Sequence, residues 1–271
     1  MLWELAAEVL GTFILILLGD GVVANVGLAP RLAAGGYNWN TITIGWCFAV
    51  VIAAYATGGV SAHLNPAVTL AMAVKRNFPW SKVIPFWVAQ VVGAFLGALA
   101  VFLCYRDGLV AAGMPNVWTT GPGSVFGQAF WGGGAGQAAG QYALITAVIT
   151  EIFGTAILLF GICSADKVTN NLGTLLVGFA VLAAGLSLGG PSGYSLNPAR
   201  DFGPRLLGVL VGTQGLFDGI YWLVAPVIAP FIGAVGGIYV YDWVVTAGLA
   251  AKKAEEAAVA KGKAGRPAAQ A

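Results

Sequence analysis

Long stretches without any charged residue are the feature that most limits what this chain can fold into. No Asp, Glu, Lys or Arg occurs between Arg31 and Lys75. Four further windows share this property: 83–105, 108–150, 168–199 and 219–241. Only 9% of the 271 residues are charged, whereas a soluble domain carries about 25% charged residues. The chain has too few charges to cover a surface that faces water, so most of its surface must face lipid.

The apolar windows predict six membrane-spanning helices, because about 20 apolar residues suffice to cross the hydrocarbon core. The first run carries Glu4 and Glu8, has no basic start and shows no clear cleavage site, so we interpret it as a span and not as a signal peptide. The expected spans are about 5–26, 40–58, 83–105, 142–163, 172–189 and 219–243.

Two apolar segments remain outside these spans, and each is about half the length needed to cross. One follows Asn65 and ends at Lys75, and the other follows Asn197 and ends near Val211. Short apolar segments at matching positions in two halves of a membrane protein indicate re-entrant helices.

The two halves of the chain also repeat each other. The string Glu-Val-Leu-Gly-Thr that begins at Glu8 is echoed by Glu-Ile-Phe-Gly-Thr beginning at Glu151, 143 positions later. Leu-Asn-Pro-Ala at 64–67 recurs at 196–199, 132 positions later. Three spans per half is an odd number, so the second copy inserts upside down. The predicted fold is therefore an all-α membrane protein with six transmembrane helices and two re-entrant half-helices in an inverted repeat.

A single channel domain is expected over residues 1–249, with a first repeat at about 4–105 and a second at about 142–245. Residues 250–271 are rich in Ala, Lys, Glu and Gly, which predicts a fraying helix followed by a disordered tail. Lys and Arg are concentrated in this tail and after the first half-helix. The positive-inside rule therefore places both termini in the cytoplasm.

The outer connections contain few charged residues, mainly Arg31 and the pair of adjacent residues Arg106 and Asp107. The segment 107–141 has no charge after Asp107, so we expect it to form an ordered outer loop on the protein surface.

The repeated Asn-Pro-Ala triad supplies what a helix needs in order to begin inside a membrane. The first backbone N–H groups of a helix lack partners, and in hydrocarbon this costs several kcal/mol for each group. Asn65 and Asn197 are expected to cap these groups with their side-chain oxygens, and the following Pro lacks the N–H. Each asparagine amide is then free to donate hydrogen bonds to a passing neutral solute. Two helix N-termini at one point also form a barrier to cations and protons.

Several charged residues fall within the predicted spans or half-helices. Arg200 is costly at membrane depth, so it must face water or a partner, and Asp201 is the alternative partner that we consider. Asp20 is expected near the outer end of the first span, where exposure to water costs little. Glu8 and Glu151 have no partner that is visible in the sequence alone.

Taken together, these strings resemble the aquaporin superfamily, also called the major intrinsic proteins, over about residues 4–245. The resemblance is carried by Ala-Glu-Val-Leu-Gly-Thr at 7–12, His-Leu-Asn-Pro-Ala-Val-Thr at 63–69 and Asn-Pro-Ala-Arg-Asp-Phe-Gly-Pro-Arg at 197–205. Asp201 directly after Arg200 is similar to the glycerol-facilitator, or aquaglyceroporin, branch.

The resemblance implies a selectivity filter made of Trp46, Gly185, Tyr194 and Arg200. Water-selective filters hold His where this chain has Gly185, which implies a wider pore. Trp46 and Tyr194 offer an apolar corner and Arg200 offers donors, a combination that suits a polyol.

The resemblance further implies that Glu8 and Glu151 anchor the re-entrant loops and aim their carbonyl groups into the pore, and the alternative role for them is a proton relay. The carbonyls expected to line the pore belong to Ser61, Ala62, His63, Leu64, Gly193, Tyr194 and Ser195. The His63 side chain is either a satisfied structural group or part of the inner pore wall. Asp201 is expected to support a loop rather than contact solute.

The function that follows is passive conduction of glycerol and other small neutral solutes, with some water and without ions or protons. The resemblance also implies a homotetramer, and we expect it in the cell membrane. We expect no cofactor, no metal, no nucleic acid and no enzymatic activity, because the chain has one His and three Cys in apolar stretches, and it lacks a phosphate-binding loop.

Three alternatives remain open. The first is a channel that prefers water, urea or ammonia. The second is a coupled secondary transporter, for which Asp20, Glu8 and Glu151 are the candidate ion ligands. The third is a structural membrane protein with a closed pore.

Overall fold

The computed structural model describes residues 1–28, 38–121, 124 and 140–264. Within these residues, six helices are long and apolar enough to cross a membrane, as the charge-free windows predict. Five of them are α1 (Leu2–Gly27), α3 (Trp39–Thr57), α5 (Trp80–Ala111), α8 (Gly140–Ala165) and α9 (Gly173–Ser192). The sixth continues through α11 (Tyr221–Leu223), η1 (Val224–Ile228), α12 (Ala229–Tyr241), η2 (Asp242–Thr246) and α13 (Ala247–Ala264).

Two shorter helices, α4 (Pro66–Lys75) and α10 (Pro198–Leu210), follow the two asparagines. At 1.5 Å per residue they span about 15–20 Å, which is too short for a hydrocarbon core of about 30 Å. α4 packs against α5 and α12, while α10 packs against α5. Both half-helices are therefore confirmed, and with them the aquaporin-like fold class.

The two halves pack in the same way. α1 lies against α3 and α5, and α8 lies against α9 and α12. Glycines permit the closest of these approaches. A Cβ on Gly97 of α5 would lie 2.7 Å from the carbonyl oxygen of Phe13, and one on Gly237 of α12 would lie 2.8 Å from the Cα of Ala156. Small residues at both interfaces thus let the helix backbones touch.

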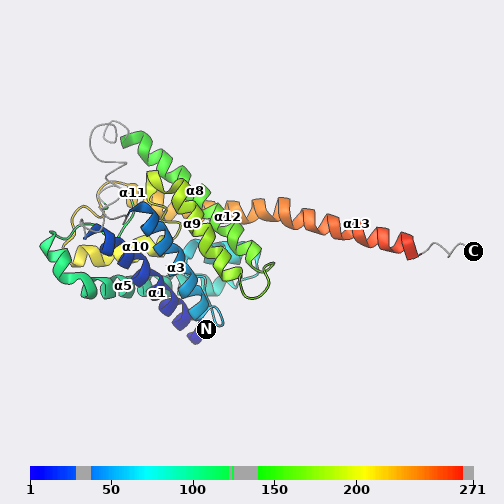
Figure 1. Cartoon of the computed structure of the whole chain (residues 1–271), viewed down its shortest axis with the longest axis horizontal. Helices are drawn as coiled ribbons and strands as arrows, with labels where there is room; N and C mark the ends of the chain where they lie inside the picture. Colours follow the sequence, from blue (N-terminus) through cyan, green and yellow to red (C-terminus); the bar gives the residue numbers. More distant parts are fainter. Residues whose placement is uncertain (29–37, 122–123, 125–139, 265–271) are drawn as a thin grey trace, which may run out of the picture.

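The ends of two helices lie beyond the expected limits. α5 continues past Arg106 and Asp107 to Ala111, so the outer connection begins later than residue 107. The last helix remains helical to Ala264 and projects away from the bundle (Figure 1). Residues 265–271 at the end of the tail, and Arg31 in the first outer connection, lie outside the described residues.

Candidate functional site

A cavity of about 310 Å³ lies between the two half-helix tips and extends to both sides of them. Its lining includes Trp46 and Gly58, which are twelve residues apart and therefore about 18 Å apart along the line of α3. One wall is apolar and is formed by Leu15, Val50, Ala54, Leu158, Ile162, Val177 and Val181. The facing wall carries polar groups of His63, Asn65, Tyr194, Ser195, Asn197 and Arg200. A solute with one hydrocarbon face and one hydroxyl face meets a matching wall on each side.

The tips of the half-helices are capped as the sequence predicts. The Asn65 Oδ1 atom accepts a hydrogen bond of 2.8 Å from the Ala67 N–H. The Asn197 Oδ1 atom accepts from the N–H groups of Ala199 at 3.0 Å and Arg200 at 3.3 Å. Because the positive ends of α4 and α10 meet at this point, a cation faces an unfavourable potential there.

The asparagine amides also connect the two halves. Asn65 Nδ2 donates to the Leu196 carbonyl at 2.8 Å, and Asn197 Nδ2 donates to the Leu64 carbonyl at 2.7 Å. An amide carries two N–H donors, so one donor of each group is used here and the other is left for the cavity. This corrects the expectation that both amides are wholly free. It also shows that the Leu64 carbonyl, expected to face the pore, already accepts a hydrogen bond from protein.

Two fully buried glutamates hold the re-entrant loops. Glu8 accepts hydrogen bonds of 2.7 Å from the backbone N–H groups of both His63 and Leu64. Glu151 accepts from the N–H groups of Ser195 at 2.6 Å and Leu196 at 2.7 Å. These bonds engage the backbone directly before each asparagine, where irregular structure is tolerated only beside a cavity.

The leucine before each asparagine has an unusual backbone conformation. Leu64 has φ of 54° and Leu196 has φ of 55°, values in the left-handed region that a leucine seldom adopts. The glutamate carboxylate bound to each leucine N–H offsets the cost of this conformation.

Trp46, Tyr194 and Arg200 meet at one end of the cavity and are all buried. The guanidinium carbon of Arg200 lies 4.1 Å from the centre of the Trp46 ring, within the distance of a cation–π contact. Trp39 packs edge-on against Tyr194, with ring centres 5.5 Å apart. These contacts fix two aromatic rings and one guanidinium that line the cavity.

Gly185 has a different position from the one that the resemblance implies. A Cβ at Gly185 would lie 2.8 Å from two atoms of the Tyr194 ring. The missing side chain therefore makes room for Tyr194, and Gly185 itself lies behind that ring, outside the set of described residues that line the cavity. Its carbonyl accepts a hydrogen bond of 3.0 Å from the Trp39 indole.

The acidic partners near the filter also differ from expectation. Asp20 is not at a water-exposed end of its span, because its side chain is fully buried with Oδ1 3.5 Å from Arg200 Nη1. Asp201, the alternative partner for Arg200, instead pairs with Arg205 at 2.6 Å. The second oxygen of Asp201 accepts hydrogen bonds from the backbone N–H and the hydroxyl of Thr120, at 2.8 and 2.7 Å.

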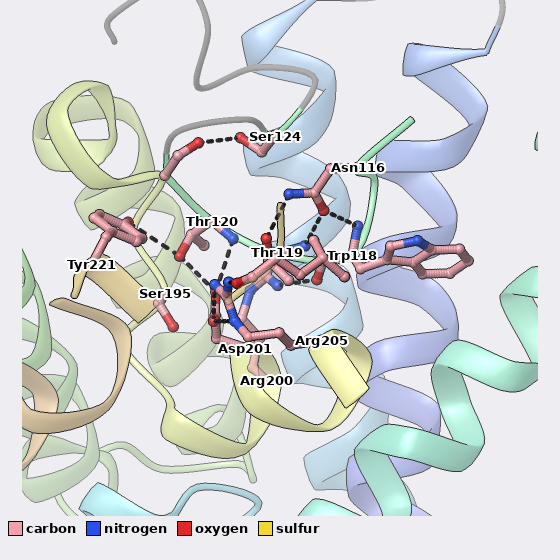
Figure 2. Close-up of polar contacts among 12 residues, drawn as sticks. Asn116, Trp118, Thr119, Thr120, Ser124, Ser195, Arg200, Asp201, Arg205 and Tyr221 are labelled. Atoms are coloured by element: carbon pink, nitrogen blue, oxygen red, sulfur yellow. Dashed lines mark hydrogen bonds and ion pairs between the residues drawn. The ribbon is translucent and has the colours of Figure 1, made fainter. Parts of the chain in front are cut away.

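The outer connection folds down onto α10 next to these groups, as Figure 2 shows. The Asn116 side-chain oxygen accepts hydrogen bonds from the N–H groups of Trp118 and Thr119, at 3.2 and 3.1 Å. The Trp118 carbonyl accepts a hydrogen bond of 3.1 Å from Arg200 Nη1, and its side chain is fully buried. This part of the segment is thus enclosed by protein, and does not lie on the surface as expected.

Trp118 and Thr120 are site residues that the sequence analysis did not single out. The signal for them is weak, consisting of a long outer connection that lacks charge after Asp107. A connection of this composition is better suited to burial than to water, and burial is what brings its backbone to Arg200.

His63 lies at the other side of the half-helix tips, among aromatic side chains. Its Nδ1 atom is 3.1 Å from the Thr69 hydroxyl, and its ring lies 4.7 Å from the ring of Phe78 and 5.4 Å from that of Phe86. It also lines the cavity. The two roles considered for His63 therefore coincide in one position.

Comparison with known proteins identifies the family to which this architecture belongs. The chain matches the family model described as "Major intrinsic protein" over residues 1–241. The chain belongs to the major intrinsic protein family. It is 43% identical over 249 residues to a probable glycerol uptake facilitator protein from Thermotoga maritima, with 88% of this chain and 97% of the relative covered. It is 38% identical over 252 residues to a glycerol uptake facilitator protein from Streptococcus pneumoniae, with 89% and 99% covered.

A solved structure supports the same assignment for this major intrinsic protein. The X-ray structure of the aquaglyceroporin from Plasmodium falciparum is similar with a TM-score of 0.75 and 29% sequence identity. The similarity covers 90% of this chain and 96% of the other. The resemblance seen in the motifs is thereby confirmed, and the chain is an integral membrane protein with several spans.

Proposed function

We propose that this major intrinsic protein is a passive channel for glycerol and other small neutral solutes, with some water flux. The observation that carries the proposal is the two-sided cavity, apolar on one wall and polar on the other, whose lining includes Trp46, Tyr194 and Arg200. Glycerol has carbon atoms for the first wall and three hydroxyl groups for the second. The relatives named as glycerol uptake facilitators support the same solute.

Solute passes the filter and then the two asparagine tips. Arg200 donates to a solute hydroxyl while the Trp46 and Tyr194 rings contact its carbon atoms. The spare amide donors of Asn65 and Asn197 replace further bonds to water. The remaining acceptors are the carbonyls of Ser61, Ala62, His63, Gly193, Tyr194 and Ser195.

Ions and protons are excluded by the same groups. The N-termini of α4 and α10 raise the energy of a cation at the centre of the cavity. The apolar side chains of α1, α3, α8 and α9 that line the cavity cannot replace an ion's hydration shell, and shedding that shell is costly. A neutral polyol loses far less hydration on entry and therefore passes.

The channel lies in the cell membrane as a homotetramer with both termini in the cytoplasm. Exposed apolar side chains of α3, such as Ile44, Phe48 and Ile52, are 47–56% exposed in one copy of the chain, which suits contact with lipid or a neighbouring subunit. Lys75 ends the first half-helix and Arg76 and Lys82 follow it, a cluster that favours the cytoplasmic side.

Uptake of radiolabelled glycerol into proteoliposomes tests this function. We expect rapid equilibration with the outside concentration and no accumulation above it when a proton or sodium gradient is imposed. Accumulation driven by either gradient would show a coupled transporter instead.

A matched pair of variants connects the flux to the cavity. Ala62 lines the cavity, whereas Val60 in the same loop is 58% exposed. We expect A62W to abolish most glycerol uptake by filling the passage, and V60W to leave it unchanged. Equal uptake by A62W and the parent protein would show that solute does not use this cavity.

A further inference from the structure

Asp20 is a buried carboxylate that the proposed permeation path does not use. It lies in α1, its side chain is fully buried, and neither of its oxygens accepts a hydrogen bond from any residue that the structure describes. A buried ionised carboxylate without compensation is strongly unfavourable, so such a group requires a countercharge or a proton.

Arg200 supplies the countercharge. Its Nη1 atom lies 3.5 Å from Asp20 Oδ1 and also donates to the Trp118 carbonyl at 3.1 Å. The Trp46 ring lies on a further side, 4.1 Å from the guanidinium carbon. The guanidinium is therefore fixed by α1, by the outer connection and by α3 together.

The packing of α1 places Asp20 behind the filter and not within the opening. A Cβ on the preceding residue, Gly19, would overlap the Trp46 ring, so α1 and α3 approach closely at this level. Trp46 and Arg200 line the cavity, whereas Asp20 is fully enclosed. Asp20 thus contacts Arg200 from a buried position outside the cavity lining.

The other acid near the filter does not perform this task. Asp201 is engaged by Arg205 at 2.6 Å and by the Thr120 hydroxyl at 2.7 Å. Of the two acids, Asp20 is the one that forms an ion pair with Arg200.

We propose that Asp20 is a positioning residue that determines the specificity of the filter. As the counterion of Arg200, it holds the guanidinium back against the wall beside Trp46 and cancels most of its charge. The opening then remains wide enough for a polyol, and Arg200 still offers hydrogen-bond donors without attracting anions. This inference rests on the proposed function as a glycerol channel.

The substitution D20N tests the proposal in proteoliposomes, because it keeps the size of the side chain and removes its charge. Without the counterion, Arg200 turns toward the hydrated cavity and narrows it. We expect glycerol permeability to fall about tenfold or more, as for the loss of one hydrogen bond to a charged group, with a smaller loss of water permeability. We also expect formate permeability to rise, a change that a merely structural role for Asp20 would not produce.

D107N is the matched control, because the Asp107 side chain is fully exposed and pairs only loosely with Arg106 at 3.7 Å. If the parent protein conducts glycerol and D20N matches D107N in its glycerol, water and formate rates, the role of Asp20 is overturned while the glycerol channel stands. If the parent protein does not conduct glycerol, the proposed function is overturned. The ion pair between Asp20 and Arg200 is then tested by the recovery of folded protein alone.

That recovery is compared for R200Q and for D20N/R200Q by gel filtration in detergent. R200Q leaves the buried Asp20 charge without a partner, whereas the double variant removes both charges. We expect several-fold more folded protein from the double variant. Equal recovery of the two, or failure of both to fold, would overturn the proposed pairing.

Discussion

The first and second re-entrant segments present the same backbone to the cavity but different side chains. Asn65 and Asn197 cap their half-helices alike and bond across to each other's half. Three residues after the asparagine, however, the first segment has Val68 and the second has Arg200. Both of these residues line the cavity.

At neighbouring positions too, the second segment carries the charged or the larger side chain. Thr69 in the first segment corresponds to Asp201 in the second, and Ala62 corresponds to Tyr194. The repeat therefore supplies the passage and the capped tips twice, whereas of the two segments only the second contributes side chains to the filter, where they join Trp46 of α3. A filter side chain of the second segment can therefore be changed while the capped tips stay intact.

The largest expected difference between the segments concerns Asp201 and Thr69. D201N removes the charge that compensates the buried Arg205, and we expect it to lower the free energy of unfolding by about 3–5 kcal/mol. T69V breaks the bonds of the Thr69 hydroxyl with Gln90, His63 and the Asn65 carbonyl and should cost about 1–3 kcal/mol. Thermal unfolding in detergent measures both, and equal losses would contradict the asymmetry.

The next largest effect is the loss of stability expected when Glu8 or Glu151 is replaced by Gln. In either segment, Glu→Gln replaces one acceptor oxygen by a donor, so a backbone N–H loses its bond, at a cost of about 1.5–3 kcal/mol. Glu8 also accepts from Ser61 at 2.6 Å and from Gln90 at 2.8 Å. We therefore expect E8Q to lower the unfolding temperature more than E151Q. The reverse order would show that the extra donors around Glu8 do not contribute.

A smaller effect, on selectivity and not on stability, is expected at Tyr194. Y194A makes the second segment resemble the first at this position and widens the filter. Permeability to four- and five-carbon polyols should rise about tenfold relative to glycerol, the scale on which apolar pockets separate solutes of different size. F179A, which removes an aromatic side chain that is 50% exposed on α9, should leave the ratio unchanged. An unchanged ratio in Y194A would remove Tyr194 from the filter.

The smallest effect is expected at the outer connection. T120V removes one of the two hydrogen bonds that Asp201 accepts from Thr120 but keeps the backbone bond. We expect a loss of about 0.5–1.5 kcal/mol and a modest decrease in glycerol flux, since the Trp118 carbonyl is held less firmly against Arg200. If flux falls as far as in D20N, the outer connection is as important to the filter as the ion pair between Asp20 and Arg200.

Much of the fold could be predicted from the sequence because the physical constraints are local in the chain. The charge-free windows indicate the spans, and an Asn-Pro pair before a half-length segment indicates a capped helix at membrane depth. The caps of Asn65 and Asn197 need no information from the rest of the molecule. For this reason both tips could be predicted without coordinates.

The rest of the site depends on contacts between distant parts of the chain. Asp20 and Arg200 are 180 positions apart, and no spacing rule connects them. The bonds between each asparagine amide and the opposite leucine carbonyl exist only because the two tips meet. The missing side chain at Gly185 makes room for the Tyr194 ring and does not line the cavity, because the position of that ring depends on the rotamer of a side chain in the loop after α9.

The most direct test of the account is stopped-flow light scattering of proteoliposomes exposed to a glycerol gradient and, separately, to a gradient of an impermeant sugar. We expect rapid shrinkage in both, followed by rapid reswelling in glycerol alone, at a rate far above that of empty liposomes. Rapid shrinkage without reswelling in glycerol would contradict it, because the opening beside Trp46, Tyr194 and Arg200 would then admit water and exclude the polyol.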